Sequence, residues 1–330
     1  MKRKIIAMGL AVASALLFMG CEKELDPKLS GSLVPKTVDQ DKTLPSINVN
    51  GTQLHAETFG NPLDPMIVFL HGGPGGDYRN ELNVKALAEN NYYVVFYDQR
   101  GSGLSKRHTR DSYSLQVMLD DLTAVIQHYR GSPTQKVFLF GHSWGAMLAT
   151  AYVNQYPTKI NGVVLAEPGG FTWDDVKEYS ASSRKLALFS EATNDAVYTD
   201  QFFTGNEDSH TILDYKLALG SAFTYSKDNA EGIEGPSPFW RYGAVVLNKL
   251  FDIGEKDGFN FKNNLAQFTT KVLFLYSENN KAYGEPFARK LSANYPNVQL
   301  SKVNGTGHEM IYFGWDKVYP LTKTYYDSLR

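Results

Sequence analysis

Residues 137–149 have the sequence Val-Phe-Leu-Phe-Gly-His-Ser-Trp-Gly-Ala-Met-Leu-Ala, and this stretch decides the fold. Its first four residues form an apolar run typical of a buried strand, and its last part is rich in alanine, the residue that most favours helix. Ser143 is therefore expected in a tight strand-to-helix turn, where Gly141 and Gly145 let neighbouring backbone approach closely. Such a turn lifts the hydroxyl above the sheet and places it at a helix N-terminus, which favours developing negative charge. We expect Ser143 to be a nucleophile.

Strand and helix patterns alternate on both sides of this stretch. The expected strands are 47–52 with 54–59, 66–70, 92–97, 137–140, 163–165, 272–276 and 298–303, and the expected helices are 114–129, 146–156, 282–295 and 315–329. Such alternation implies an α/β fold with a mostly parallel central sheet, built from right-handed crossovers and flanked by helices. From about Phe171 to Phe261 the alternation stops and aromatic residues are frequent, which predicts an inserted, mostly helical cap.

The first twenty residues have the pattern of an export signal. Lys2, Arg3 and Lys4 precede the apolar stretch Ile5–Met19, which is shorter than the roughly 20 apolar residues of a membrane-spanning helix. Cys21, the only cysteine in the chain, follows directly after Gly20. This arrangement resembles a bacterial lipoprotein signal, in which cleavage precedes the cysteine and a lipid is attached to its sulfur. An ordinary signal peptide with an incidental cysteine is the alternative.

These patterns divide the chain into five expected parts. They are a lipoprotein-type signal peptide at 1–20, a flexible tether at 21–44, the first part of the α/β core at 45–170, the helical cap at 171–262 and the second part of the core at 263–330. Lipid attachment to Cys21 would anchor an exported protein in the bacterial cell envelope, at the periplasm or the cell surface.

The charge balance excludes one class of partner. The formal net charge is -2 and the pI is about 6.4, and loss of the signal with its three basic residues makes the charge -5. No basic excess is available to hold a phosphate backbone, so nucleic acid is not an expected partner. The expected partners are a small-molecule or short-peptide substrate and, through the lipid anchor, a membrane. We expect no metal and no cofactor.

An oxyanion hole is expected beside Ser143. The run HGGPG at residues 71–75 follows the expected strand 66–70, the place where a loop supplies one backbone N–H to a developing oxyanion. The residue after the nucleophile supplies the other N–H. We assign the first donor to Gly73, with Gly72 as the neighbouring choice, and the second donor to Trp144.

The expected general base is His308. It lies in the run GTGHE at residues 305–309, between the last expected strand and the last expected helix. A base must take the proton of the serine hydroxyl and later give it to the leaving group. The other six histidines either lack a motif or lie inside motifs that give them structural roles.

The acid that supports His308 has three candidates. Its usual place is the loop after strand 272–276, but the run SENN at residues 277–280 puts Asn280 there. Glu278 could take the role from two residues earlier, or Asn280 could merely orient the ring. We favour Glu167, which follows strand 163–165, because three strand ends would then bring the serine, the acid and the base to one sheet edge. A carboxylate directly after a buried strand also needs a partner.

Three runs together resemble the proline iminopeptidase family of α/β hydrolases, peptidase family S33: HGGPG at 71–75, DQRGSGLS at 98–105 and GHSWG at 141–145. The resemblance covers about residues 51–168 and 271–315 but not the cap. It implies an α/β-hydrolase fold and removal of an N-terminal residue, often proline, through an acyl-enzyme, with residues 98–101 shaping the floor of the site.

The chain departs from that family at two positions. His142 stands where the family has glycine, and Asn280 stands where it has the triad aspartate. An acid at Glu167 is similar to the arrangement in some haloalkane dehalogenases. Dehalogenase and epoxide hydrolase chemistry, however, needs an aspartate nucleophile, and this chain has Ser143.

The leading hypothesis is an exported serine hydrolase that cleaves an amide or ester, most specifically an aminopeptidase. An aminopeptidase needs carboxylates near the nucleophile for the substrate ammonium, and the expected cap contains Glu191, Asp195, Glu207, Asp208, Glu231 and Glu234. A carboxylesterase or lactonase acting on a small hydrophobic acyl group is the alternative, consistent with an aromatic cap. A binding protein on a hydrolase fold is a third hypothesis, which the presence of both Ser143 and His308 disfavours.

Overall fold

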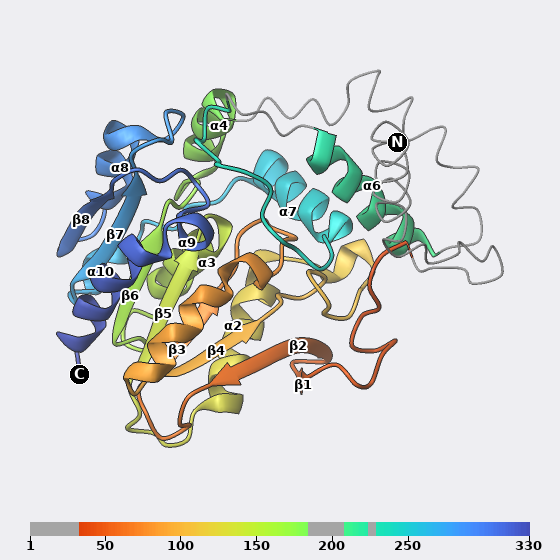
Figure 1. Cartoon of the computed structure of the whole chain (residues 1–330), viewed down its shortest axis with the longest axis horizontal. Helices are drawn as coiled ribbons and strands as arrows, with labels where there is room; N and C mark the ends of the chain where they lie inside the picture. Colours follow the sequence, from red (N-terminus) through yellow and green to blue (C-terminus); the bar gives the residue numbers. More distant parts are fainter. Residues whose placement is uncertain (1–32, 184–207, 224–228) are drawn as a thin grey trace, which may run out of the picture. The chain divides into compact units, whose positions relative to one another are not determined.

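The computed structural model describes residues 33–183, 208–223 and 229–330, and its elements are arranged as in Figure 1. Its eight strands are β1 (Ser46–Val49), β2 (Thr52–Phe59), β3 (Met66–Leu70), β4 (Tyr93–Tyr97), β5 (Val137–His142), β6 (Gly162–Ala166), β7 (Val272–Ser277) and β8 (Val298–Val303). They form one sheet in the order β1-β2-β4-β3-β5-β6-β7-β8. The β1–β2 and β2–β4 pairs are antiparallel, and every other pair is parallel. The predicted mostly parallel sheet is confirmed.

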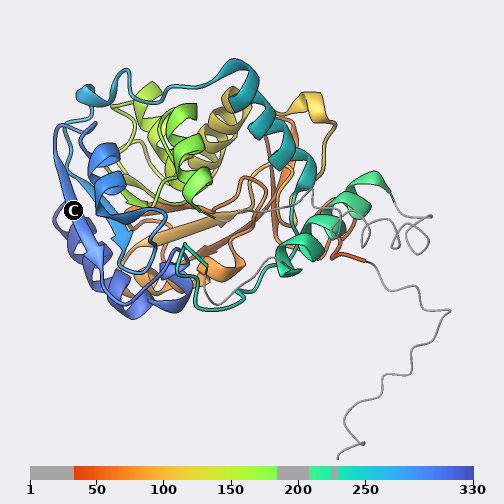
Figure 2. The ribbon, with the colours of Figure 1, turned by 90° about the horizontal axis from the view of Figure 1, so that it is seen from above.

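Helices cover both faces of this sheet (Figure 2). Alternate residues of β3 point to opposite faces: Val68 and Leu70 belong to one buried cluster, and Ile67 and Phe69 to the other. The first cluster includes residues of α2 (Leu115–Tyr129), α3 (Trp144–Gln155) and α8 (Gly284–Ser292). The second includes residues of η1 (Arg79–Asn90), α9 (Met310–Phe313) and α10 (Trp315–Asp327). Burial on both faces explains why the central strands are continuous apolar runs.

Two local features differ from the sequence expectation. The helix expected at 282–295 spans Gly284–Ser292, and the N–H groups of Lys281 and Ala282 just before it donate to Ala230 O. The 3₁₀ helix η1 was not predicted, since its stretch is largely polar and has no clear helical period. Two further short 3₁₀ turns are η2 (Arg110–Ser112) and η3 (Leu265–Gln267).

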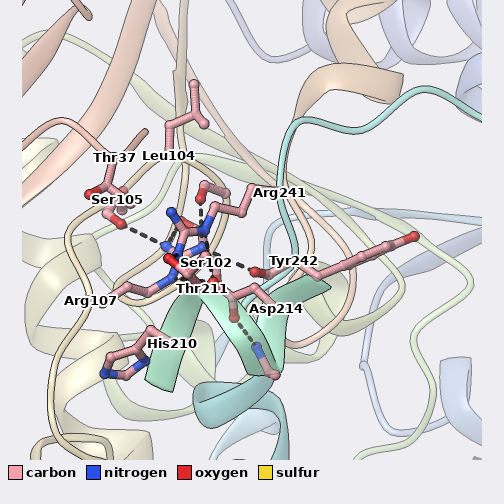
Figure 3. Close-up of polar contacts among 12 residues, drawn as sticks. Thr37, Ser102, Leu104, Ser105, Arg107, His210, Thr211, Asp214, Arg241 and Tyr242 are labelled. Carbon is pink, nitrogen blue, oxygen red and sulfur yellow. Dashed lines mark hydrogen bonds and ion pairs between the residues drawn. The ribbon is translucent and has the colours of Figure 1, made fainter. Parts of the chain in front are cut away.

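The region between β6 and β7 contributes α4 (Trp173–Ser182), α6 (Ser209–Phe223) and α7 (Ala244–Asp257) to the described chain. Asp214 of α6 anchors this region on the core (Figure 3). Its Oδ2 lies 3.0 Å from Arg107 Nε and 2.8 Å from Arg241 Nε, and its Oδ1 accepts from Ala244 N at 2.8 Å. Both arginines are almost fully buried, so the shared carboxylate neutralises charge that would otherwise be costly there.

Part of the predicted tether at 21–44 is packed against the core. Val34, Thr37 and Val38 are buried, Val38 N donates to Leu104 O, and Arg241 Nη1 donates to Pro35 O. These apolar and backbone contacts hold the segment from Val34 onward in place. The predicted signal peptide, Cys21 and the earlier part of the tether lie outside the described residues. Within the described ranges, no helix has the length and apolar character needed to cross a membrane.

Candidate active site

Ser143 lies in a sharp bend between β5 and α3. Its backbone has φ 52° and ψ −118°, a conformation that non-glycine residues rarely adopt, and its N–H donates to Ala166 O at 2.9 Å. A Cβ on Gly141 would collide with the Gly145 carbonyl, and a Cβ on Gly145 would collide with the Leu70 carbonyl. The two glycines are therefore required by the crowding of the bend.

Glu167 contacts His308 at the same edge of the sheet. Its Oε2 lies 2.7 Å from His308 Nδ1, and both side chains are buried. The Oε1 atom accepts from Ser277 N at 2.7 Å and from Ser277 Oγ at 2.6 Å, while Oε2 also accepts from Asn280 Nδ2 at 2.9 Å. Burial raises the pKa of Glu167, but the hydrogen bonds and charge of His308 and the bonds from Ser277 outweigh it and lower the pKa below its ordinary value. Glu167 is thus held as a carboxylate.

Neither of the other two acid candidates hydrogen-bonds His308. The Glu278 carboxylate binds Lys302 Nζ at 3.0 Å and Gly305 N at 2.9 Å, with 40% of its side chain exposed, so it braces the loop before His308 from outside. Asn280 contacts Glu167 through its amide, as given above, and its Oδ1 accepts from Tyr283 N at 3.1 Å. Of the three candidates, Glu167 is the one that hydrogen-bonds His308.

His142 joins the serine bend to the loop of His308. Its Nε2 lies 2.8 Å from the carbonyl oxygen of His308, which can only accept, so Nε2 carries a hydrogen. Its Nδ1 lies 2.6 Å from Glu81 Oε1 in the unpredicted helix η1. Burial lowers the pKa of His142, but the hydrogen bond and charge of Glu81 outweigh it and raise the pKa to about 9. Sequence reasoning missed Glu81 because no motif surrounds it.

The loop at 71–75 lies directly against Ser143. A Cβ on Gly72 would stand 3.4 Å from Ser143 Cβ, and Gly73 has φ +130°, a backbone region open mainly to glycine. Trp144 begins α3, so its backbone N–H has no partner within that helix. Gly73 and Trp144 remain the predicted oxyanion donors, and both belong to segments that adjoin Ser143.

His71 and Gln99 fix the shape of this loop. His71 Nδ1 lies 2.8 Å from Gly72 O, and its Nε2 accepts from Gln99 N at 2.9 Å. Burial lowers the pKa of His71, which keeps the ring neutral and its Nε2 free to accept. Gln99 Oε1 accepts from Trp144 Nε1 at 2.8 Å. Residues of the DQRG run thus support both predicted oxyanion segments.

A metal centre finds no support in the part of the chain that the structure describes, where no three His, Cys, Asp or Glu side chains gather to hold an ion. Of the cap carboxylates, that of Asp208 caps the start of α6 by accepting from His210 N and Thr211 N. The Glu234 carboxylate accepts from Gly307 N in the loop of His308, and the Glu231 carboxylate accepts from Tyr179 Oη. Glu191, Asp195 and Glu207 lie outside the described residues.

Known proteins resemble this chain in sequence and in fold. A model of the family "Serine aminopeptidase, S33" matches residues 61–222. Epoxide hydrolase B of Mycobacterium tuberculosis is 33% identical over 36% of this chain and 33% of its own length. A proline iminopeptidase of Thermoplasma volcanium is 34% identical over 30% of this chain and 33% of its own length. Proline iminopeptidase PfmaB of Pestalotiopsis fici is 28% identical over 80% of this chain and 92% of its own. The chain thus spans about a third of the length of epoxide hydrolase B and of the Thermoplasma volcanium enzyme, and most of the length of PfmaB.

Solved structures share the fold at lower identity. The proline iminopeptidase of Mycobacterium smegmatis superposes with a TM-score of 0.58 at 16% identity, covering 86% of this chain and 98% of its own. Est816, an enzyme that degrades N-acyl homoserine lactones, gives a TM-score of 0.55 at 17% identity, covering 85% of this chain and 99% of its own. The chain thus has the α/β-hydrolase fold and resembles proteins of the α/β-hydrolase superfamily in sequence. Its sequence is similar to the S33 serine aminopeptidase family over residues 61–222, and proline iminopeptidases are among its relatives.

Proposed function

We propose that the protein is a serine hydrolase in which Ser143 is the nucleophile, His308 the general base and Glu167 the acid that supports the base. The observation that carries this proposal is the 2.7 Å contact between Glu167 Oε2 and His308 Nδ1. In addition, the His308 carbonyl accepts a hydrogen bond from His142, the residue before Ser143. Nδ1 must carry a hydrogen to bond a carboxylate, which leaves Nε2 of the neutral ring free to accept the serine proton.

The reaction then follows from this tautomer. Nε2 of His308 takes the hydroxyl proton as Ser143 Oγ attacks the substrate carbonyl carbon. The resulting oxyanion accepts hydrogen bonds from the N–H groups of Gly73 and Trp144, while Glu167 stabilises the imidazolium. The imidazolium gives its proton to the leaving amine or alkoxide as the acyl bond breaks. Water, deprotonated by His308, then hydrolyses the acyl-enzyme and restores Ser143.

The most specific activity that we propose is aminopeptidase cleavage of an N-terminal residue. The S33 family match and the proline iminopeptidase relatives support it, PfmaB over most of both chains. Epoxide hydrolysis is disfavoured despite the likeness to epoxide hydrolase B, because that chemistry uses an aspartate nucleophile and the bend here holds Ser143. Carboxylesterase or lactonase activity is the remaining candidate.

Substrate turnover decides between these activities. Purified protein lacking residues 1–20 is assayed on a prolyl arylamide, other aminoacyl arylamides and p-nitrophenyl esters of graded chain length, with Ser143→Ala as the matched control. The aminopeptidase proposal predicts kcat/KM higher on arylamides with a free amine than on their N-acetylated forms. Turnover confined to esters would replace it by the esterase alternative, and equal turnover by Ser143→Ala would overturn the serine mechanism itself.

We also propose that the protein is exported and carries a lipid on Cys21. The basic residues Lys2 to Lys4, the apolar stretch after them and the single cysteine support this proposal.

A further inference from the structure

A short segment of the cap, Asn229–Glu234, lies between the loop that follows β7 and the loop of His308. Its backbone carbonyl at Ala230 accepts from the N–H groups of residues 281 and 282, and the carbonyl of Glu231 accepts from His308 N at 2.9 Å. The Glu234 carboxylate accepts from Gly307 N at 3.0 Å. The cap therefore holds the general base through its backbone as well as covering the sheet edge.

The side chain of Glu231 reaches the acid side of the site through Tyr179 of α4. Tyr179 Oη lies 2.8 Å from Glu231 Oε1, and both residues are buried. Burial and the neighbouring carboxylates of Glu231 and Glu167 raise the pKa of Tyr179 well above its ordinary value, so the hydroxyl keeps its hydrogen. A hydroxyl has one hydrogen, and here it points to Glu231. The oxygen of Tyr179 is thereby polarised toward negative charge.

That oxygen faces two members of the site. It accepts from Asn280 Nδ2 at 3.2 Å and lies 3.5 Å from His308 Nδ1, the ring nitrogen that also bonds Glu167. Asn280 divides its amide hydrogens between Glu167 and Tyr179, and its Oδ1 is fixed by a backbone donor. An aspartate at this position could donate to neither. The asparagine is therefore matched to a site with a carboxylate on one side of its amide and the polarised Tyr179 oxygen on the other.

We propose that Tyr179 and Glu231 are positioning residues that add a second buried carboxylate to the acid side of His308. Glu231 acts through the Tyr179 hydroxyl, which turns its oxygen toward the Nδ1 hydrogen of His308 and so favours the imidazolium that forms during acyl transfer. This inference rests on the proposed function of Ser143 and His308. It also assigns one of the cap carboxylates to the support of the base and not to the ammonium of a substrate.

Other charged groups around His308 are accounted for. Glu167 lies on its Nδ1 side, and the His142 ring, paired with Glu81, lies with its centroid 4.9 Å away. Glu309, the residue after His308, accepts a hydrogen bond from Asn80 Nδ2 at 2.8 Å. None of these groups bonds Tyr179, so variants of Tyr179 and Glu231 change one path to His308 and leave the others in place.

The test compares Tyr179→Phe, Glu231→Gln and the double variant on one ester substrate without an amine. We expect each single variant to lower kcat about fivefold with KM changed less than twofold, and the acidic limb of the pH–kcat profile to move to lower pH. Glu231→Gln loses the carboxylate charge, and Tyr179→Phe loses the hydroxyl oxygen through which that charge reaches His308. The double variant should be no worse than either single variant, since both remove the same path. The matched control is Tyr295→Phe. Tyr295 is also a buried tyrosine, but its hydroxyl bonds Thr150, at 3.0 Å.

The outcomes separate this inference from the proposed function. An unmoved acidic limb in both single variants, or losses that multiply in the double variant, would overturn the inference while leaving the serine mechanism intact. A rise in KM confined to substrates with a free amine in Glu231→Gln would assign that carboxylate to substrate binding instead. Should Tyr179→Phe fail to fold, the pH profile of Glu231→Gln decides alone. Absence of Ser143-dependent turnover in the unmodified protein would count against the proposed function.

Discussion

Replacing Glu167 by glutamine should abolish most of the activity while leaving the shape of the site intact. The carboxylate receives four hydrogen bonds: two from Ser277, one from Asn280 and one from His308. Glutamine is isosteric but has only one oxygen for these four donors. With that oxygen toward Ser277, the new amide NH₂ faces His308 Nδ1 and forces this nitrogen to accept. The ring then carries its hydrogen on Nε2 and cannot take the serine proton.

The magnitude follows from this change of tautomer and from the lost charge. Loss of the correct tautomer by an acid-to-amide change costs about 10⁴-fold in kcat in a serine protease. Here Tyr179 still offers a weak acceptor 3.5 Å from Nδ1, so we expect a loss of about 10³–10⁴-fold in kcat. KM should change little because Glu167 is fully buried and does not face substrate.

The assay is steady-state kinetics with the best substrate from the panel, and circular dichroism shows whether the variant is folded. Glu278→Gln is the control, because its carboxylate is partly exposed and bonds Lys302 and not His308, and it should retain near-full turnover. The reasoning is refuted if folded Glu167→Gln keeps more than about a tenth of wild-type kcat or if Glu278→Gln suffers the larger loss.

Three further predictions concern stability and export. The pKa of His142 is raised from 6.5 to about 9, and burial raises the pKa of its partner Glu81 to about 7, so the charged pair contributes to the unfolding free energy between these values and is lost as pH rises through about 9. Urea unfolding from pH 7 to pH 9 should show the stability advantage of wild type over Glu81→Gln shrinking, and a growing advantage would contradict this prediction. Asp214→Ala should lower the unfolding free energy by about 3–5 kcal/mol because two buried arginines lose their shared carboxylate, whereas Asp252→Asn, at an exposed pair with Arg110, should leave the melting temperature unchanged. In a bacterial host that processes lipoproteins, Cys21→Ser should abolish globomycin-sensitive maturation and palmitate incorporation, and a wild-type protein recovered entirely as a soluble, unlipidated product would refute the anchor.

Most of the core could be predicted because its signals are local. The strands around Ser143 are apolar on both faces of one sheet, and the crowding that requires Gly141 and Gly145 leaves a recognisable pattern in the sequence. The start of α2 was equally readable, since Ser114 caps it by accepting from Val117 N. Where the fold depends on such neighbouring residues, sequence reasoning and structure agree.

The acid side of the site was harder because its contacts join distant segments. Glu167 was favoured over Glu278 from its position at the end of a buried strand and from the need of such a carboxylate for a partner. What decides the contact is the turn after β6, where Glu167 has φ 43° and bonds His308. Tyr179 and Glu231 come from the cap, where no motif marks them. Their roles depend on how α4 and the segment at 229–234 fold back onto the core, and a single sequence carries no local signal for that.

The most direct measurement of the central claim is covalent labelling of the nucleophile. The full-length protein and its Ser143→Ala and Glu167→Gln variants are incubated with a fluorophosphonate, and the adducts are located by intact mass and peptide mapping. We expect one adduct on wild type, located on Ser143, absent from Ser143→Ala and formed at least about a hundredfold more slowly in Glu167→Gln. An unlabelled wild-type protein, or an adduct on another residue, would contradict it.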